Sequence, residues 1–129
     1  MNMSEPEVTQ SDRTLSQEEF DDLMISLVTR MRETGRSFKN VYAMETGKIP
    51  AQRMSKLLNL PIIEDKNEIE LHTVVVYTVS ESGSSFRKLK EEVGDFYSVA
   101  LVMNYHTGFV PHIYGLLRKN KWIRFPWQE

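Results

Sequence analysis

Apolar side chains follow two different spacings along this chain, and each spacing predicts a different kind of element. In the segment LSQEEFDDLMISLVTRMRETG, apolar residues recur every three or four positions, which is the rhythm of one buried helix face. Ser16, with Glu19 three positions later, forms a capping-box pattern at the start of this segment. Gly35 is placed to end it. We therefore predict a helix here.

Further along, near-continuous apolar runs alternate with segments of helical spacing. Strands are expected at 37–44, 61–64, 72–79, 96–105 and within 107–117. Between them, one helix is expected to begin at Pro50 and end before Pro61, and another to run from about Ser85 to Glu92. Apolar strands alternating with helices favour an α/β fold with a mainly parallel, twisted sheet of four or five strands flanked by helices.

The bulk properties describe an ordinary globular domain. The chain has 129 residues, a net charge of −2 and no cysteine. We expect a flexible, polar lead-in at 1–13 and a single domain at 14–129. The charge gives no reason to expect nucleic acid as a partner. Because no apolar run approaches the roughly 18 residues of a membrane span and no signal peptide is recognisable, we expect a cytoplasmic protein with no membrane partner.

Two small polar turns, ETGK (45–48) and ESGSS (81–85), each follow a predicted strand. The carboxyl ends of parallel strands meet at one edge, where ligands bind. In ESGSS, Gly83 permits a tight turn, the serines add hydroxyls, and the next helix presents its positive end. These features favour a phosphate site; the alternative is a plain strand-to-helix turn capped by serine. We expect Gly83→Val to abolish phosphate binding and to spare the fold.

The stretch VVVYTVSESGSSF (74–86) resembles the ribose-phosphate signature of the type I phosphoribosyltransferases, which has an apolar strand, two acids, two mostly apolar residues, and then an acid and a small glycine turn. The first helical segment resembles the family's leading helix. ETGKIPAQRMSKLLNLP resembles its pyrophosphate loop, and KWIRFPWQE resembles the tail of small xanthine- and guanine-type (purine) members. The resemblance extends from Thr14 to Glu129.

This resemblance implies transfer of ribose 5-phosphate from phosphoribosyl pyrophosphate (PRPP) to a nitrogen of a purine base, or the reverse, with release of pyrophosphate and with Mg²⁺. It also implies a role for each matching position. The 5-phosphate would be held by Ser82, Gly83, Ser84 and Ser85; the pyrophosphate loop would be Glu45, Thr46, Gly47 and Lys48; the ribose would face Tyr77 and Thr78; Glu81 would handle the proton of the base; Trp122, Ile123 and Gln128 would contact the base.

The chain departs from the resembled pattern where ligands are held. Tyr77 and Thr78 stand in place of the two acids that grip the ribose hydroxyls. Two lost charge-assisted hydrogen bonds cost about 3–6 kcal/mol, or roughly two to four decades in rate. Glu45 stands where a basic residue is frequent, and its carboxylate would repel pyrophosphate unless Mg²⁺ or Lys48 intervenes. No metal ligands among the side chains are assigned, so Mg²⁺ is implied by the resemblance alone.

Three interpretations therefore stay open. The first is a purine-type phosphoribosyltransferase with reduced or altered activity. The second is a non-catalytic regulator that binds a nucleotide or a phosphosugar. The third is an interaction protein on the same scaffold. The expected ligand is PRPP or a purine nucleotide, and we expect the chain to form a homodimer.

Overall fold

The computed structural model describes residues 7–9, 12–119 and 123–128. Its central sheet has six strands in the order β1-β7-β6-β5-β3-β4, and all neighbouring strands are parallel. The strands are β1 (Glu7–Thr9), β3 (Asn40–Ala43), β4 (Ile62–Ile63), β5 (Thr73–Ser80), β6 (Tyr97–Asn104) and β7 (Ile113–Arg118). A second, two-stranded parallel sheet pairs β2 (Arg13–Thr14) with β8 (Ile123–Arg124).

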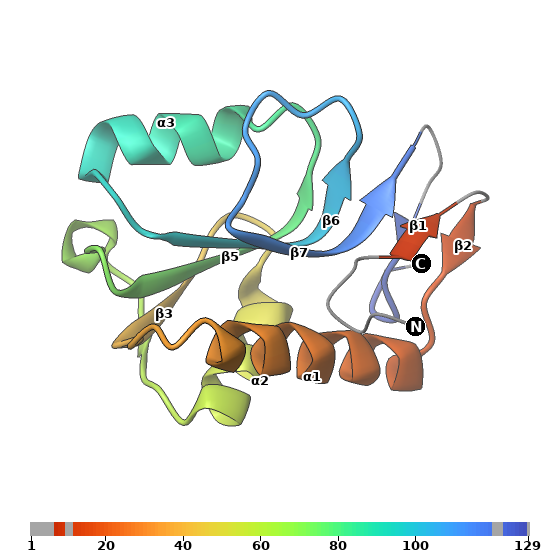
Figure 1. The fold of residues 1–129 in the computed structure, drawn as a ribbon, viewed down its shortest axis with the longest axis horizontal. Helices are drawn as coiled ribbons and strands as arrows, with labels where there is room; N and C mark the ends of the chain where they lie inside the picture. Colours follow the sequence, from red (N-terminus) through yellow and green to blue (C-terminus); the bar gives the residue numbers. More distant parts are fainter. Residues whose placement is uncertain (1–6, 10–11, 120–122, 129) are drawn as a thin grey trace.

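Helices cover both faces of the central sheet (Figure 1). Helices α1 (Gln17–Glu33) and α2 (Lys48–Leu58) lie on one face, and α3 (Ser84–Val93) lies on the other. A short 3₁₀ helix, η1 (Lys66–Glu68), precedes β5. The predicted α/β fold with a parallel sheet flanked by helices is therefore confirmed. Five of the strands arise from the predicted segments, and β1 adds a strand within the region 1–13, where we expected a flexible lead-in.

Local sequence signals explain where the helices begin. The capping box of α1 is formed, because Ser16 Oγ accepts a hydrogen bond from the backbone of Glu19 and the Glu19 carboxylate accepts one from the backbone of Ser16, both at 3.1 Å. Helix α2 begins at Lys48, two residues before Pro50, the expected first position. Pro50 is tolerated because N–H groups in the first helical turn have no partner within the helix.

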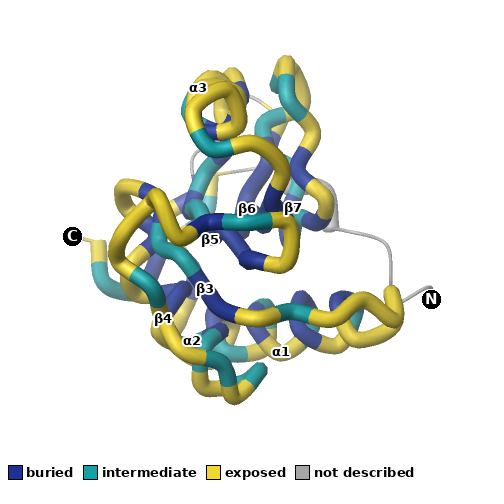
Figure 2. Tube along the Cα trace, turned by 90° about the vertical axis from the view of Figure 1, so that its left-hand side faces the viewer, coloured by how far each residue is buried: buried dark blue, intermediate teal, exposed yellow. Residues whose placement is uncertain are grey.

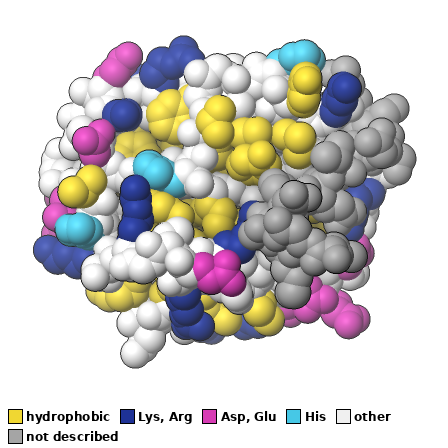
Figure 3. Space-filling view, viewed as in Figure 1, with side chains coloured by type: hydrophobic (Ala, Val, Ile, Leu, Met, Phe, Trp, Pro, Cys, Tyr) yellow, Lys and Arg dark blue, Asp and Glu magenta, His cyan; other side chains and the backbone are white. Residues whose placement is uncertain are grey.

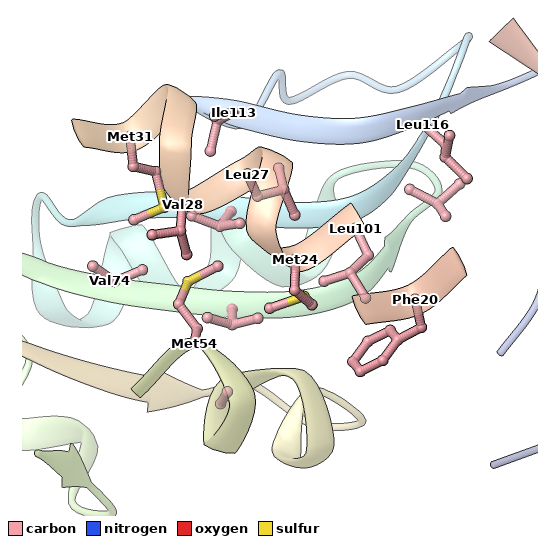
Figure 4. Close-up of a cluster of buried hydrophobic side chains, with 14 of the residues drawn as sticks. Phe20, Met24, Leu27, Val28, Met31, Met54, Val74, Leu101, Ile113 and Leu116 are labelled. Carbon is pink, nitrogen blue, oxygen red and sulfur yellow. The ribbon is translucent and has the colours of Figure 1, made fainter. Parts of the chain in front are cut away.

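The core lies in two layers, one on each face of the sheet. The larger layer packs the apolar faces of α1 and α2 against β5, β6 and β7. Figure 4 shows Met24, Val28 and Met54 directed towards Val74 and Leu101. The smaller layer packs α3 on the opposite face. In Figure 2 the strands are accordingly buried between helices whose outer sides are exposed. Burial on both faces explains why the strands read as continuous apolar runs.

The surface is mixed in character. In the view of Figure 1, hydrophobic side chains gather across the middle of the face, with lysine and arginine side chains scattered around them (Figure 3). Within the described part of the chain, no helix combines the length and the apolar composition needed to cross a membrane.

Candidate nucleotide site at the carboxyl edge of the sheet

The two polar turns meet at one edge of the sheet. The turn at 45–48 follows β3 and the turn at 81–85 follows β5, and these strands are parallel neighbours that pair from Asn40 and Thr73 onwards. The side-chain hydroxyls of Thr46 and Thr78 lie 2.5 Å apart and join the two strand ends. The expected common edge is thus present, and the turns are close enough to serve one ligand.

A cavity of about 320 Å³ opens between these strand ends. Most of its lining comes from positions that the sequence marked as site residues: Thr46, Tyr77, Thr78, Glu81, Ser82, Gly83, Ser84, Ser85 and Gln128. The remaining lining residues are Val79, Ser80, Phe86 and Trp127. The cavity therefore lies where parallel sheets place their ligands, at the carboxyl ends of the strands.

The phosphate turn requires glycine for two reasons. Gly83 has φ +82° and ψ 3°, the left-handed conformation that glycine adopts without strain, and it precedes the first residue of α3. A Cβ atom there would also lie 2.4 Å from Cβ and 2.6 Å from the backbone nitrogen of Phe109. Ser82 and Ser84 are exposed beside it, and the Ser82 hydroxyl accepts a 3.3 Å hydrogen bond from the Ser84 backbone.

The loop between β6 and β7 supports this turn from outside. The backbone N–H of Gly108 donates to the Ser82 carbonyl over 2.8 Å, and Arg87 of α3 donates to the Gly108 carbonyl over 2.9 Å. Phe109 stacks on Phe86 with ring centroids 5.4 Å apart. Sequence reasoning missed this support because Phe109 lies 26 positions after Gly83, and no local pattern marks the contact.

Glu45 connects the pyrophosphate turn to the phosphate turn. Its φ is +50°, an uncommon backbone conformation for a residue with a side chain. One carboxylate oxygen accepts a 2.8 Å hydrogen bond from the Tyr77 hydroxyl, and the other accepts one of 3.2 Å from Ser85 Oγ. Burial, followed by this hydrogen bond to Glu45, raises the pKa of Tyr77, so its phenol keeps its proton at neutral pH.

Other residues of the predicted pyrophosphate loop stand outside the cavity. Glu45 lines a neighbouring cavity of about 500 Å³, which it shares with Ser84 and Ser85. Gly47 is buried against β5, where a Cβ atom would lie 2.2 Å from the Val76 carbonyl oxygen. Lys48 is exposed at the start of α2. Close packing on the β5 backbone therefore accounts for the glycine at position 47.

Glu81, the predicted acid, is held by a residue that the sequence analysis did not select. Arg118, the last residue of β7, donates to the Glu81 carboxylate over 2.8 Å. The Arg118 side chain is 10% exposed and the Glu81 side chain is 62% exposed. One feature of the sequence could have identified Arg118: it is an arginine that ends an apolar strand and so lies at the same edge of the sheet. The ion pair orients the Glu81 carboxylate at the edge of the cavity.

The C-terminal tail contributes to the same cavity. Trp127 and Gln128 line it, and the Gln128 side-chain oxygen accepts a 2.9 Å hydrogen bond from the backbone of Phe125. Trp127 stacks on Phe125 with centroids 5.0 Å apart and meets Phe20 edge-on. Ile123 is buried in β8 and does not line the cavity. Trp122, predicted to stack on the base, lies outside the described residues.

The residues at this edge do not fit a resident metal ion. Among the described residues, no group of three or more His, Cys, Asp or Glu side chains could hold one. Tyr77 and Thr78 present hydroxyls where an acid pair would bind a hydrated cation, and the Glu45 carboxylate is already engaged by two hydroxyls.

The architecture and the edge cavity together define the fold of the type I phosphoribosyltransferases. The structure is similar to that of a purine phosphoribosyltransferase from Pyrococcus horikoshii, with 25% sequence identity and a TM-score of 0.73 over 93% of this chain and 96% of that chain. It is also similar to a xanthine-guanine-hypoxanthine phosphoribosyltransferase from Helicobacter pylori, with 21% identity and a TM-score of 0.71 over 90% of this chain and 92% of that one.

A third solved structure of this fold belongs to a hypothetical protein from Neisseria gonorrhoeae with bound ppGpp. It shares 15% identity with this chain, with a TM-score of 0.75 over 94% of this chain and 92% of that chain. No protein-family model matches the sequence, and no curated protein matches it significantly. The predicted likeness to type I phosphoribosyltransferases is thus confirmed for the fold.

Proposed function

We propose that this protein binds a purine nucleotide, with the phosphate at Ser82–Ser85, and that it transfers phosphoribosyl groups slowly compared with an ordinary enzyme of this fold. One observation carries the proposal. At the end of β5, the glycine turn is kept, whereas the two acid positions hold Tyr77 and Thr78, whose hydroxyls bond to Glu45 and Thr46. The turn at 81–85 can therefore bind a phosphate group although no acid pair is present to bind the ribose hydroxyls.

The geometry of the turn supports phosphate binding. The turn opens α3, so its backbone N–H groups and the positive end of the helix face an incoming anion. The cavity volume falls within the roughly 300–1,000 Å³ usual for small-ligand sites. Trp127 and Gln128 offer an aromatic surface and an amide at the other side of the cavity. The nucleotides in solved structures of this fold, ppGpp and IMP, motivate the choice of a purine ligand.

A full phosphoribosyltransferase is the second candidate. The 25% identity to the Pyrococcus horikoshii purine phosphoribosyltransferase over nearly the whole of both chains favours it, as does the retained Glu81. In that case PRPP would be the substrate with its own Mg²⁺, and Thr78 would have to orient the ribose. The two candidates differ in turnover, because the first predicts binding of product-like nucleotides without efficient transfer.

Calorimetric titration of the full chain with GMP, IMP, ppGpp and PRPP, each with and without Mg²⁺, tests the proposal. We expect GMP or IMP to bind, with an affinity that changes less than about threefold on adding Mg²⁺. Turnover at an ordinary rate of about 1–1,000 per second would establish the second candidate. Failure of every nucleotide to bind would favour the interaction protein.

A substitution at Ser84 locates the phosphate. Ser84 is exposed at the first position of α3, where an acid favours the helix, so Ser84→Asp should fold normally. Its negative charge should weaken GMP binding about tenfold or more. Ser84→Asn, which has the same size and no charge, is the matched control. Equal binding by both variants would place the phosphate elsewhere. Cytoplasmic location and homodimer formation stay predictions, the latter open to analytical ultracentrifugation.

A further inference from the structure

The carboxylate of Glu45 lies beside the nucleotide site and bonds to two residues that line it. Each of its oxygens accepts a hydrogen bond, one from the Tyr77 hydroxyl at 2.8 Å and one from Ser85 Oγ at 3.2 Å. Three elements are joined by these bonds: the turn after β3, the end of β5 and the first turn of α3. Tyr77 and Ser85 line the 320 Å³ cavity, and Glu45 lines the neighbouring one. Its charge therefore lies one hydrogen bond from the ligand space.

Tyr77 is the residue that holds this charge in place. Its ring meets Phe86 edge-on, with centroids 5.8 Å apart, so packing orients the hydroxyl. The raised pKa of Tyr77 keeps the hydroxyl protonated and able to donate. The substitution of an acid by tyrosine thus has two effects. It removes a carboxylate from the ribose position, and it supplies the donor that fixes another carboxylate beside the pyrophosphate turn.

The pyrophosphate turn has little freedom to avoid that charge. The backbone N–H of Gly47 donates to the Met44 carbonyl over 2.9 Å, so this donor is occupied within the turn. Gly47 also packs directly on the backbone of Val76, and the Thr46 hydroxyl is bonded to Thr78. A turn with its own bonds satisfied and a fixed carboxylate next to it is poorly suited to receive a pyrophosphate group.

We propose that Glu45, positioned by Tyr77 and Ser85, determines specificity by excluding ligands that carry a pyrophosphate group on ribose C1, such as PRPP, and by leaving the site to nucleoside monophosphates. This inference rests on the proposed nucleotide binding at Ser82–Ser85. A nucleoside monophosphate carries a neutral base on C1, so the Glu45 charge does not oppose it. A pyrophosphate group carries several negative charges at that position, which the like charge of Glu45 would repel at short range.

The test compares the affinities of the full chain for PRPP and for GMP by calorimetry. We expect Glu45→Gln, which keeps the size and one acceptor but removes the charge, to raise the affinity for PRPP about tenfold or more and to change that for GMP less than about threefold. Glu64→Gln removes an equal charge from an exposed position after β4 and should alter neither affinity. Tyr77→Phe keeps the ring and removes the hydrogen bond to Glu45. It should also raise the affinity for PRPP relative to that for GMP, but by a smaller factor.

The outcomes separate this inference from the function on which it rests. If no nucleotide binds the natural chain, the proposed function itself fails. If GMP binds and neither Glu45→Gln nor Tyr77→Phe changes the ratio of the PRPP and GMP affinities, the inference is wrong and the function stands. Tighter binding of PRPP than of GMP by the natural chain would also overturn the inference. Because Tyr77→Phe alters a different element, a folding defect in Glu45→Gln would not prevent a decision.

Discussion

Arg118 and Glu81 form an ion pair across the carboxyl edge of the sheet, with 2.8 Å between the guanidinium nitrogen and the carboxylate oxygen. Arg118 ends β7 and Glu81 directly follows β5, and these two strands are separated in the sheet by β6. The bond therefore spans the end of the central strand. Its cationic partner is nearly buried, whereas its anionic partner reaches solvent and lines the cavity.

The unequal burial of this pair predicts an unequal response to mutation. Glu81→Ala should lower the free energy of unfolding by about 2 kcal/mol, because it removes a charge-assisted hydrogen bond from a nearly buried guanidinium. Glu92→Ala is the matched control. Its partner Lys66 and Glu92 itself are both substantially exposed, at 51% and 38%, and exposed pairs of this kind contribute little to stability. Urea unfolding measures both values, and equal losses would contradict the special role of Arg118.

Gly83 should be intolerant of any side chain. Gly83→Ala is expected to lower the free energy of unfolding by about 2–5 kcal/mol, from the strain of a positive φ together with overpacking against Phe109. Gly35→Ala is a suitable control because Gly35 also has a positive φ, +70°, and has no atom within 4 Å of its added Cβ. The unfolding temperatures of the two variants should differ clearly. Similar temperatures would show that the loop around Phe109 moves to accommodate the added methyl group.

The close approach of Phe109 changes what a substitution at Gly83 can report. Sequence reasoning suggested that Gly83→Val would remove ligand binding and spare the fold. The backbone of Phe109 makes that expectation wrong, since a Cβ atom would lie 2.6 Å from its nitrogen. Loss of binding in Gly83→Val would therefore not separate a steric block of the ligand from a displaced loop, and Ser84→Asp is the better probe.

How far the sequence predicted the structure depended on the range of each interaction. The capping box of Ser16 and Glu19 was read from residues three positions apart, and the sheet from apolar runs, because these signals are local. The turns were placed at one edge because parallel strands share their direction. The bonds that complete the site, Tyr77 with Glu45 and Arg118 with Glu81, join residues 32 and 37 positions apart. No periodic pattern encodes such a pairing.

Ser80 has a buried hydroxyl whose removal should not lower stability. Its hydroxyl is buried at the end of β5 and has no hydrogen-bond partner among the described residues. Because an unsatisfied buried polar group costs about 1–3 kcal/mol, Ser80→Ala should leave stability unchanged or raise it by about 1 kcal/mol. Thr73 on the same strand is the contrast, since its hydroxyl donates to Asn40 over 2.6 Å.

Thr73→Val should accordingly lower the free energy of unfolding by about 1–3 kcal/mol, because it leaves the buried Asn40 oxygen without this donor. Urea unfolding of the two variants in parallel gives the comparison. A loss of stability in Ser80→Ala as large as that in Thr73→Val would mean that the Ser80 hydroxyl is bonded in solution, for example to an ordered water.

His112 should make stability depend on pH in the weakly acidic range. Its pKa is lowered by burial first and then by Arg36 and Lys90, with Asp95 opposing. In the folded chain Nδ1 accepts a 3.0 Å hydrogen bond from the Ser98 backbone. Because the folded pKa lies below the unfolded value, the unfolded chain binds the proton first. The contribution of His112 is therefore complete above pH about 6.5 and is lost as pH falls through the folded pKa.

The measurement is the free energy of unfolding between pH about 7.5 and 5.5, a range that brackets the ordinary histidine pKa. The natural chain should lose stability across this range, and His112→Asn, which cannot take up a proton, should show a flatter profile. The pKa values of Glu19 and Glu92 are lowered below the ordinary glutamate value of 4.5, so these groups titrate outside the window. Parallel profiles for the two proteins would assign the pH dependence to other groups.

Introducing an acid pair at Tyr77 and Thr78 tests the proposal that its absence slows transfer, and the structure shows why Glu45 must change as well. A carboxylate in place of Tyr77 would remove a donor from Glu45 and bring two like charges together. Thr78 is 7% exposed and lies against the Thr46 hydroxyl, which can donate to an aspartate there. The informative protein is therefore the triple variant Glu45→Gln, Tyr77→Glu, Thr78→Asp, with Glu45→Gln alone as its reference.

We expect the triple variant to release pyrophosphate from PRPP with guanine, xanthine or hypoxanthine about tenfold faster than Glu45→Gln, or about 1.4 kcal/mol lower in activation free energy. The gain should require Mg²⁺, since the new acids can help to fix a hydrated cation on the ribose. GMP binding by both proteins provides the control for an intact phosphate turn. If the triple variant binds GMP and transfers no faster than its reference, the missing acids do not limit the rate, and the slow step lies in the pyrophosphate turn, whose Gly47 donor is already bonded within the chain.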